Sequence, residues 1–155
     1  MGRQFPEVVR EETDHVLDII VPRLEKDVNE KTPKGVGGAA GLAGSIHGEV
    51  VSYGASLAGV VGTPLEYGEV VEMGRRPGKR MPPVEALIPW VRSILGITEE
   101  KEQRGVAFVI ARKISIEGFE GAHMFGETWE KDKRWVQEML YTIRDRVVKR
   151  VNSRQ

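Results

Sequence analysis

Apolar side chains recur every three to four positions along the N-terminal segment. They are Phe5, Val9, Val16, Ile20, Leu24 and Val28, separated mostly by charged and polar residues. This spacing places them on one face of a helix, so we predict a long amphipathic helix from Phe5 to about Glu30. Pro22 lies inside it without the backbone N–H that a helix interior uses, so a kink or break is expected there. Thr32-Pro33 should end the helix.

A second long stripe lies in the C-terminal segment, from about Gly126 to Asn152. Its members are Trp129, Val136, Leu140, Ile143, Val147 and Val151, and its last turn is basic. Two helices of roughly 25 residues would each be roughly 38 Å long at 1.5 Å per residue, longer than a compact domain of this size needs. We therefore expect part of one stripe to contact another subunit.

Two shorter helices are predicted in the middle of the chain. The first carries Val84, Leu87, Ile88, Val91 and Leu95 and should end at Gly96, with Pro89 a local irregularity. The second starts at Thr98-Glu99-Glu100, where acidic residues favour the helix dipole, and runs to Gly118. Its buried stripe is expected to comprise Val106, Val109, Ile110, Lys113 and Ile114.

Short strand-like runs separate the first helix from the middle ones. Residues 46–53 and 56–61 have β-branched and aromatic content, and Gly54-Ala55 between them suits a hairpin. The segment 65–74 could extend the sheet or form a short helix, and its periodicity allows both. The expected fold is therefore α+β, a small antiparallel sheet packed against long amphipathic helices.

Two loops stand out by composition. Residues 34–45 contain five glycines and mostly small side chains, which carry a high backbone entropy cost and little packing area, so we predict a mobile loop. Residues 75–83, RRPGKRMPP, place two positive pairs around the turn dipeptide Pro77-Gly78. We predict an exposed basic loop there, followed by a helix start at the second proline of Pro82-Pro83.

Composition limits the broad class of the protein. A chain of 155 residues suits one domain, residues 1–155, with 40% hydrophobic and 30% charged residues. The N-terminal segment lacks the apolar core of a signal peptide, and no stretch approaches a membrane span, so a soluble protein without a classical export signal is expected. Lys plus Arg equal Asp plus Glu at 23 each, so attraction to nucleic acid must be local.

No residue pattern indicates catalysis or a bound cofactor. The absence of cysteine excludes thiolate nucleophiles and cysteine-based metal motifs. The glycine-rich stretch lacks the phosphate-binding endings, and the serines lack a nucleophile elbow. His15, His47 and His123 lie in distant segments without metal-ligand spacing. We expect a protein that is not an enzyme, with no catalytic residue, no metal and no cofactor.

Polar and aromatic side chains suggest contacts with partners instead. The basic loop offers Arg75, Arg76, Lys79 and Arg80 for an acidic surface or a phosphate, although a solvated turn is an equally good interpretation. Gly74 and Gly78 would shape this loop and Pro77 would stiffen it. The scattered aromatic residues Tyr67, Trp90, Trp129 and Trp135 suit core or interface anchors better than a base-stacking platform.

One run of the sequence resembles a known family. Residues 62–78, GTPLEYGEVVEMGRRPG, resemble the minor tail components of bacteriophages, which carry a tyrosine and then a Val-Glu-aromatic-Gly segment; here that segment reads Val71-Glu72-Met73-Gly74. The likeness continues through residues 79–84 and the helix after them. Thr32-Pro33, Gly44-Ser45-Ile46 and residues 121–125 are similar to other junctions of that family. The glycine-alanine segment 35–43 replaces the family's usual stretch before the first strand.

The resemblance implies a structural role in the virion. Members of the family act in tail completion, tail termination or head-to-tail joining of long-tailed double-stranded-DNA phages, as rings around the DNA channel. It implies a homo-oligomeric ring, with six copies as the expected number, neighbouring neck and tail proteins as partners, possible non-specific contact with DNA, and no membrane. The location would be the virion neck or tail, and the host cytoplasm during assembly.

Two other functions remain open from the residues alone. An independent nucleic-acid-binding module would use the basic loop, residues 75–80, and its affinity would fall steeply with salt. The neutral net charge argues against that function. An unrecognised hydrolase would need a convergent pocket of titratable groups, which a sequence does not display.

Overall fold

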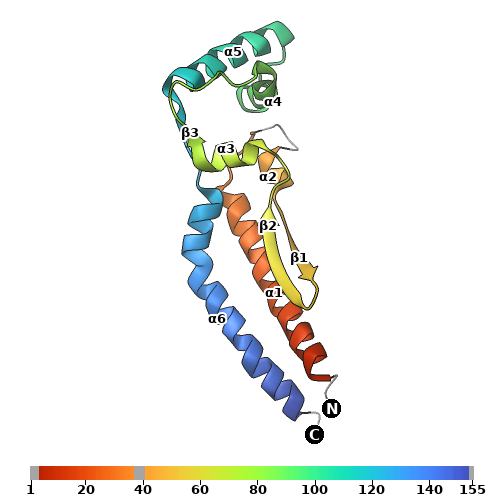
Figure 1. Cartoon of the computed structure of the whole chain (residues 1–155). Helices are drawn as coiled ribbons and strands as arrows, with labels where there is room; N and C mark the ends of the chain where they lie inside the picture. The colour runs from red at the N-terminus through yellow and green to blue at the C-terminus, as the bar shows by residue number, and fades with distance from the viewer. Residues whose placement is uncertain (1–3, 37–40, 154–155) are drawn as a thin grey trace. The chain divides into compact units, whose positions relative to one another are not determined.

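The computed structural model describes residues 4–36 and 41–153, and the chain is α+β as predicted. Its elements follow the order α1 (Gln4–Lys31), α2 (Leu42–Ser45), β1 (His47–Tyr53), β2 (Ser56–Gly62), α3 (Tyr67–Met73), β3 (Gly74–Arg75), α4 (Val84–Leu95), α5 (Glu100–Glu117), β4 (Phe119–Glu120) and α6 (Met124–Asn152) (Figure 1). Contacts divide the described chain into two compact units. Unit 1 comprises residues 4–27, 47–62 and 127–153, and unit 2 comprises residues 28–36, 41–46 and 63–126.

The core of unit 1 forms where α1 packs against α6. Val16 and Ile20 of α1 meet Val136 of α6, and Leu24, Trp135, Met139 and Ile143 pack around them. Burial of such side chains contributes about 1.5–3 kcal/mol each. The predicted stripes are thus confirmed at Val16, Ile20 and Val136. They are wrong at Phe5 of α1 and at Trp129 and Leu140 of α6, which are exposed. The buried face of α6 reaches Val136 through Thr128 and Asp132, not through Trp129.

Pro22 does not break α1. The helix continues from Gln4 to Lys31 with Pro22 inside it, so the expected break is wrong. Both Pro22 and Asp18, whose carbonyl loses its usual partner, are exposed. Water can therefore satisfy that carbonyl, and the helix is held in place by its buried face.

Ion pairs border the α1–α6 core of unit 1. The buried carboxylate of Glu12 accepts from Arg146 Nε at 2.7 Å and from Arg150 Nη1 at 2.8 Å. The hydrogen bond from Arg146 and, to a smaller extent, that from Arg150 hold the pKa of Glu12 below its usual range. Lys131 Nζ donates to Asp27 at 2.7 Å, and this bond lowers the pKa of Asp27. Arg23 lies 3.9 Å over the ring of Trp135.

The β1–β2 hairpin is the second layer of unit 1 on α1. The strands pair antiparallel from His47↔Gly62 to Tyr53↔Ser56, with Gly54-Ala55 as the predicted turn. A Cβ on Gly48 or Gly59 would lie within 2.6 Å of a methyl carbon of Val21. Glycine at these two positions therefore lets the sheet approach the helix closely.

Unit 2 contains the paired helices α4 and α5. Val91 of α4 and Gln103, Ala107 and Ala111 of α5 are fully buried. The helix ends agree with the sequence, since α4 stops at left-handed Gly96 and the Glu99 side chain caps α5 at the backbone N–H groups of Lys101 and Glu102. The stripe predicted for α5 is wrong at Val109 and Lys113, which are both exposed, because small residues face α4 instead.

The glycine-rich segment ends in a short helix that was not predicted. Residues 37–40 lie outside the described residues, but α2 follows them directly and its Leu42 is fully buried. Leu42 N donates to Val36 O at 2.8 Å, and Ser45 Oγ lies 2.6 Å from Thr63 Oγ1. The prediction of a loop over residues 34–45 is therefore wrong for residues 42–45, which form α2 around one large buried apolar side chain.

The ambiguous segment 65–74 becomes a short helix followed by a strand. α3 covers Tyr67–Met73, and the two-residue strand β3 then pairs antiparallel with β4 in a ladder separate from the hairpin. The part of the chain that the structure describes contains no helix with the length and apolar character that crossing a membrane demands.

Candidate interaction site around the basic loop

In unit 2 the basic loop, residues 75–83, is held by a tight crossing of two backbone segments, β3 and β4. Gly74 pairs with Glu120 and Arg75 with Phe119. A Cβ on Gly118 would lie 2.1 Å from Arg75 O, and one on Gly74 would lie 2.4 Å from Gly121 N. Both glycines also have positive φ, +69° and +75°, which side chains rarely adopt. Only glycine therefore fits where β3 enters the loop and β4 leaves α5.

The basic loop is fastened to α5 by backbone groups. Gly78 N donates to Ser115 O at 2.8 Å, and Ser115 Oγ donates to Lys79 O at 2.7 Å. Arg75 Nη2 donates to the carbonyl of Arg80 across the loop. Each of these bonds fixes the loop backbone and leaves the side chains of Arg76, Lys79 and Arg80 exposed. The loop is thus exposed, as predicted, but held in one shape.

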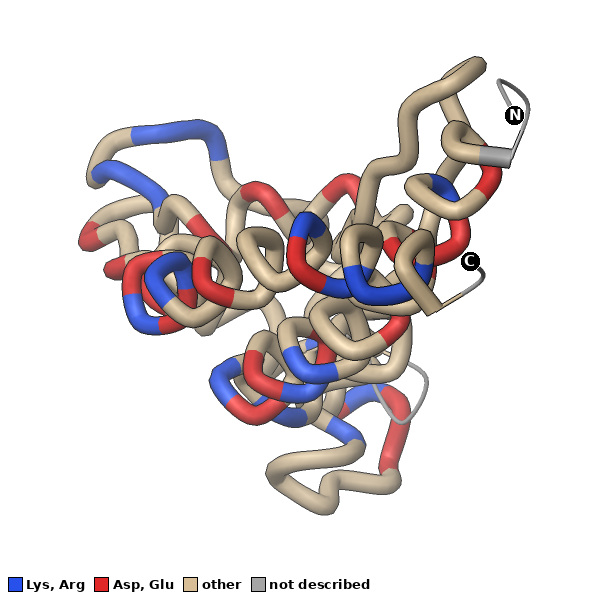
Figure 2. The backbone as a smooth tube through the Cα atoms, turned by 90° about the horizontal axis from the view of Figure 1, so that it is seen from below, with Lys and Arg blue, Asp and Glu red and all other residues tan. Residues whose placement is uncertain are grey.

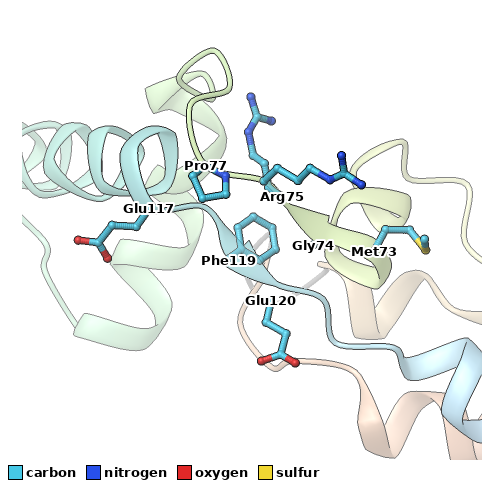
Figure 3. A pocket seen from close by; sticks show the side chains of 8 residues that line it. Met73, Gly74, Arg75, Pro77, Glu117, Phe119 and Glu120 are labelled. Carbon is cyan, nitrogen blue, oxygen red and sulfur yellow. The ribbon is translucent and has the colours of Figure 1, made fainter.

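An open pocket of about 530 Å³ lies beside the loop (Figure 3). It is lined by Met73, Gly74, Arg75, Arg76, Pro77, Glu117, Phe119 and Glu120. In Figure 3 the ring of Phe119 lies between Pro77 and Glu120, and the carboxylates of Glu117 and Glu120 point away from that ring. The pocket therefore combines apolar surface with guanidinium groups at its rim.

Three cations of the basic loop form no ion pair within the described ranges, although Glu117 and Glu120 line the same pocket as Arg76. In residues 4–36 and 41–153, no carboxylate oxygen lies within 4.0 Å of a charged nitrogen of Arg76, Lys79 or Arg80. Elsewhere Lys and Arg mix with Asp and Glu along the helices (Figure 2). Three unpaired cations close together in sequence are free to contact an anionic partner.

Glu72 ties the segment before the loop to the start of α6 within unit 2. Its carboxylate accepts from Phe125 N at 3.0 Å and from Gly126 N at 2.9 Å. A negative charge at this position satisfies free N–H groups and interacts well with the helix dipole. Ala122 N donates to Val71 O at 2.8 Å in the same junction. The segment 71–74 is thereby fixed from two sides.

The predicted site residues are only partly brought together. Gly74, Arg75, Arg76 and Pro77 line the pocket, whereas Lys79 and Arg80 lie further along the loop. Of the aromatic residues, Tyr67 starts α3 and Trp90 is half-buried in α4, both in unit 2. Trp135 packs beside the core of unit 1, while Trp129 is half exposed. Burial raises the pKa of Tyr67.

Several residues of the site were missed by sequence reasoning. They are Glu72, Ser115, Gly118, Phe119 and Gly121. The one available signal was the run Gly118-Phe119-Glu120-Gly121, in which two glycines flank an aromatic residue after a helix. Its partner strand is 44 residues earlier, from Arg75 to Phe119, so nothing local indicated the pairing.

A second unpartnered surface lies on α5. Phe108, Val109 and Ile116, the apolar face of α5, are exposed on the side opposite Gln103, Ala107 and Ala111. Apolar side chains gathered at helical spacing on an exposed face are typical of a protein contact surface. Among the residues with a described placement, no three His, Asp or Glu side chains gather as a metal ion would require.

Comparison with known proteins finds no matching family model, no matching curated protein and no matching solved structure.

Proposed function

We propose that the chain is a structural subunit of a phage neck or tail that assembles into a ring around the DNA channel. The sequence resemblance of residues 62–84 supports this function, and the observation that carries it is the apolar face of α5. Phe108, Val109 and Ile116 are exposed although the opposite face of the same helix is fully buried. Large apolar side chains gathered on the exposed side of a helix are typical of a surface that is covered on assembly.

A ring requires each subunit to use two different surfaces. In a closed ring the apolar face of one subunit meets another patch on the next copy, and the rotation closes the ring. In this proposal the apolar face of α5 supplies one side of that contact. The fixed basic loop then stays available for the adjoining virion layer, because its anchoring bonds lie within unit 2.

The function is tested by native mass spectrometry and negative-stain imaging of the purified protein. A closed ring, expected to contain six copies, supports the proposal. The variant Phe108→Glu should dissociate the ring, because a buried unpaired carboxylate opposes the contact. Ile94→Glu is the matched control, since Ile94 is equally exposed at 48% but lies on α4. A wild-type protein that stays monomeric at all concentrations, or an unaffected Phe108→Glu ring, contradicts the proposal.

A second candidate function is nucleic-acid binding by the basic loop. It is favoured by the exposed, unpaired cations Arg76, Lys79 and Arg80. Contact with phosphates predicts that affinity for a short DNA duplex falls steeply with added salt, and that Arg76→Glu combined with Lys79→Glu abolishes it. Binding that is absent at low salt, or that is unchanged in this variant, excludes this function for the loop.

A further inference from the structure

The outer edge of β2 offers unpaired backbone groups. Tyr53 and Ser56 flank a two-residue turn, so they exchange hydrogen bonds, and bonded pairs then alternate along the ladder. The backbone N–H and C=O groups of Leu57, Gly59 and Val61 therefore point away from β1. Within the described ranges, no hydrogen bond from another residue reaches these groups. Gly59 itself is exposed.

The opposite edge of the same hairpin is partly covered. On β1, Gly48 N donates to Glu25 Oε2 at 2.7 Å. Of the β1 amides that point away from β2, the one furthest from the turn therefore already has a hydrogen-bond partner. Near the turn, Arg10 donates to Ser52 Oγ at 2.7 Å and to Gly54 O at 3.3 Å. The two edges thus differ, because a side-chain hydrogen bond closes an outward backbone amide on β1 and, among the described residues, none does so on β2.

Nothing in β2 guards this edge against pairing. Exposed edges in natural sheets are usually protected by Lys, by Pro, by a bulge or by an inward charge. The strand Ser56–Gly62, SLAGVVG, contains no charged residue and no proline, and its register with β1 runs without a bulge. Its Val60 is also exposed on the side away from α1. This edge is therefore suited to accept another strand.

We infer that the occupant is β2 of a second copy of this chain, paired antiparallel about a two-fold axis at Gly59. The outward-pointing residues are spaced symmetrically about Gly59, so Leu57 of each copy faces Val61 of the other. Every outward N–H and C=O group of these residues then finds a partner. Glycine at the axis brings no side chains into conflict, and an uncharged strand places no like charges opposite one another.

The pairing joins two hairpins into a four-stranded antiparallel sheet. An isolated two-stranded hairpin is marginal in water; this one already packs on α1, and two further strands would extend its ladder. A two-fold contact of this kind is self-complementary and makes dimers, whereas a ring needs a head-to-tail contact. The inference therefore stands apart from the proposed function and uses a different surface from the apolar face of α5.

The test is amide hydrogen exchange at Leu57, Gly59 and Val61 together with native mass spectrometry over a range of concentrations. Even copy numbers, and protection of these three amides that grows with concentration, are expected. Val60→Lys should weaken pairing about tenfold, because the ammonium groups introduced in the two copies lie diagonally across the axis from each other. Adding Ala58→Glu should restore it, since residue 58 of one copy faces residue 60 of the other. Exchange in α1 reports whether each variant is folded.

Some outcomes would overturn the dimer. They are odd copy numbers only, fast concentration-independent exchange at these amides, or a folded Val60→Lys variant that associates like the wild type. The ring is tested separately, since Phe108→Glu should remove ring-sized species while leaving concentration-dependent protection of the β2 amides intact. Loss of that protection in a folded Phe108→Glu variant would assign it to the ring contact and contradict the two-fold pairing.

Discussion

At the scale of single residues, Glu12 shows what sequence patterns could not reveal. Its position on the N-terminal helix was predictable, but its partners Arg146 and Arg150 are 134 and 138 residues away. A buried carboxylate with two guanidinium partners differs energetically from the solvated helical charges around it. Its ion pairs with the two arginines can be identified only when the packing of α1 against the unit 1 part of α6 is known.

Glu12→Gln should lower the free energy of unfolding by about 1–2 kcal/mol at neutral pH, since it removes two charge-assisted hydrogen bonds from arginines that are partly exposed. Urea unfolding measures this loss. Glu11→Gln is the matched control, because Glu11 also pairs with Arg150 but is exposed, and it should change stability by less than about 0.5 kcal/mol. Equal effects of the two substitutions would contradict the assignment.

The same carboxylate predicts a dependence on pH. Because its pKa in the folded protein lies below the ordinary value of 4.5, its stabilising contribution is complete above 4.5 and is lost as pH falls through the lowered folded pKa. Glutamine does not titrate, so the stability difference between wild type and Glu12→Gln should shrink in that acid range. A difference that stays constant or grows in acid would contradict this origin.

At the scale of elements, periodicity and caps predicted most of the helices. The bounds of α4, α5 and the hairpin came from Gly96, Gly118 and Gly54, because end signals depend on local backbone geometry. The faces were less predictable. On α5 the alanines face α4 and larger apolar residues face outward, an inversion that depends on how closely the two helices approach.

Two glycines near one helix should respond oppositely to alanine. Gly118→Ala should destabilise by more than about 2 kcal/mol, because its Cβ would meet the carbonyl of Arg75 at a positive φ. Gly105→Ala should stabilise by about 0.5–1 kcal/mol, since it lies inside α5 with open space around it. Thermal or urea unfolding of both variants measures this, and a neutral Gly118→Ala would refute the tight crossing.

At the scale of the whole molecule, the division into units was not predicted. Single-residue patterns carry no information on which distant segments pack together, and unit 1 is built from three separate stretches of chain. The candidate site was only partly predicted for the same reason. Residues 75–83 were identified from their composition. Ser115, on the helix α5, and Phe119, on the strand β4, contact this loop but were not predicted to do so.

Hydrogen exchange should distinguish the two units. Val136→Ala removes buried side-chain atoms from the core of unit 1, and a loss of about 2 kcal/mol corresponds to roughly thirtyfold faster exchange there. Val91→Ala is the matched control in unit 2 and should accelerate amides in residues 63–126 instead. Identical acceleration across the chain in both variants would show that the units open only together.

The three-part construction of unit 1 also sets an order of events at the ribosome. Val16 and Ile20 leave the exit tunnel before their partner Val136, which follows Ile20 by 116 positions. At about 5–20 residues per second, the apolar face of the nascent α1 waits about 6–23 s for that partner. Unit 2 is complete in the emerged chain before unit 1 is, so translation leaves a hydrophobic helix uncovered long enough for a chaperone to bind it.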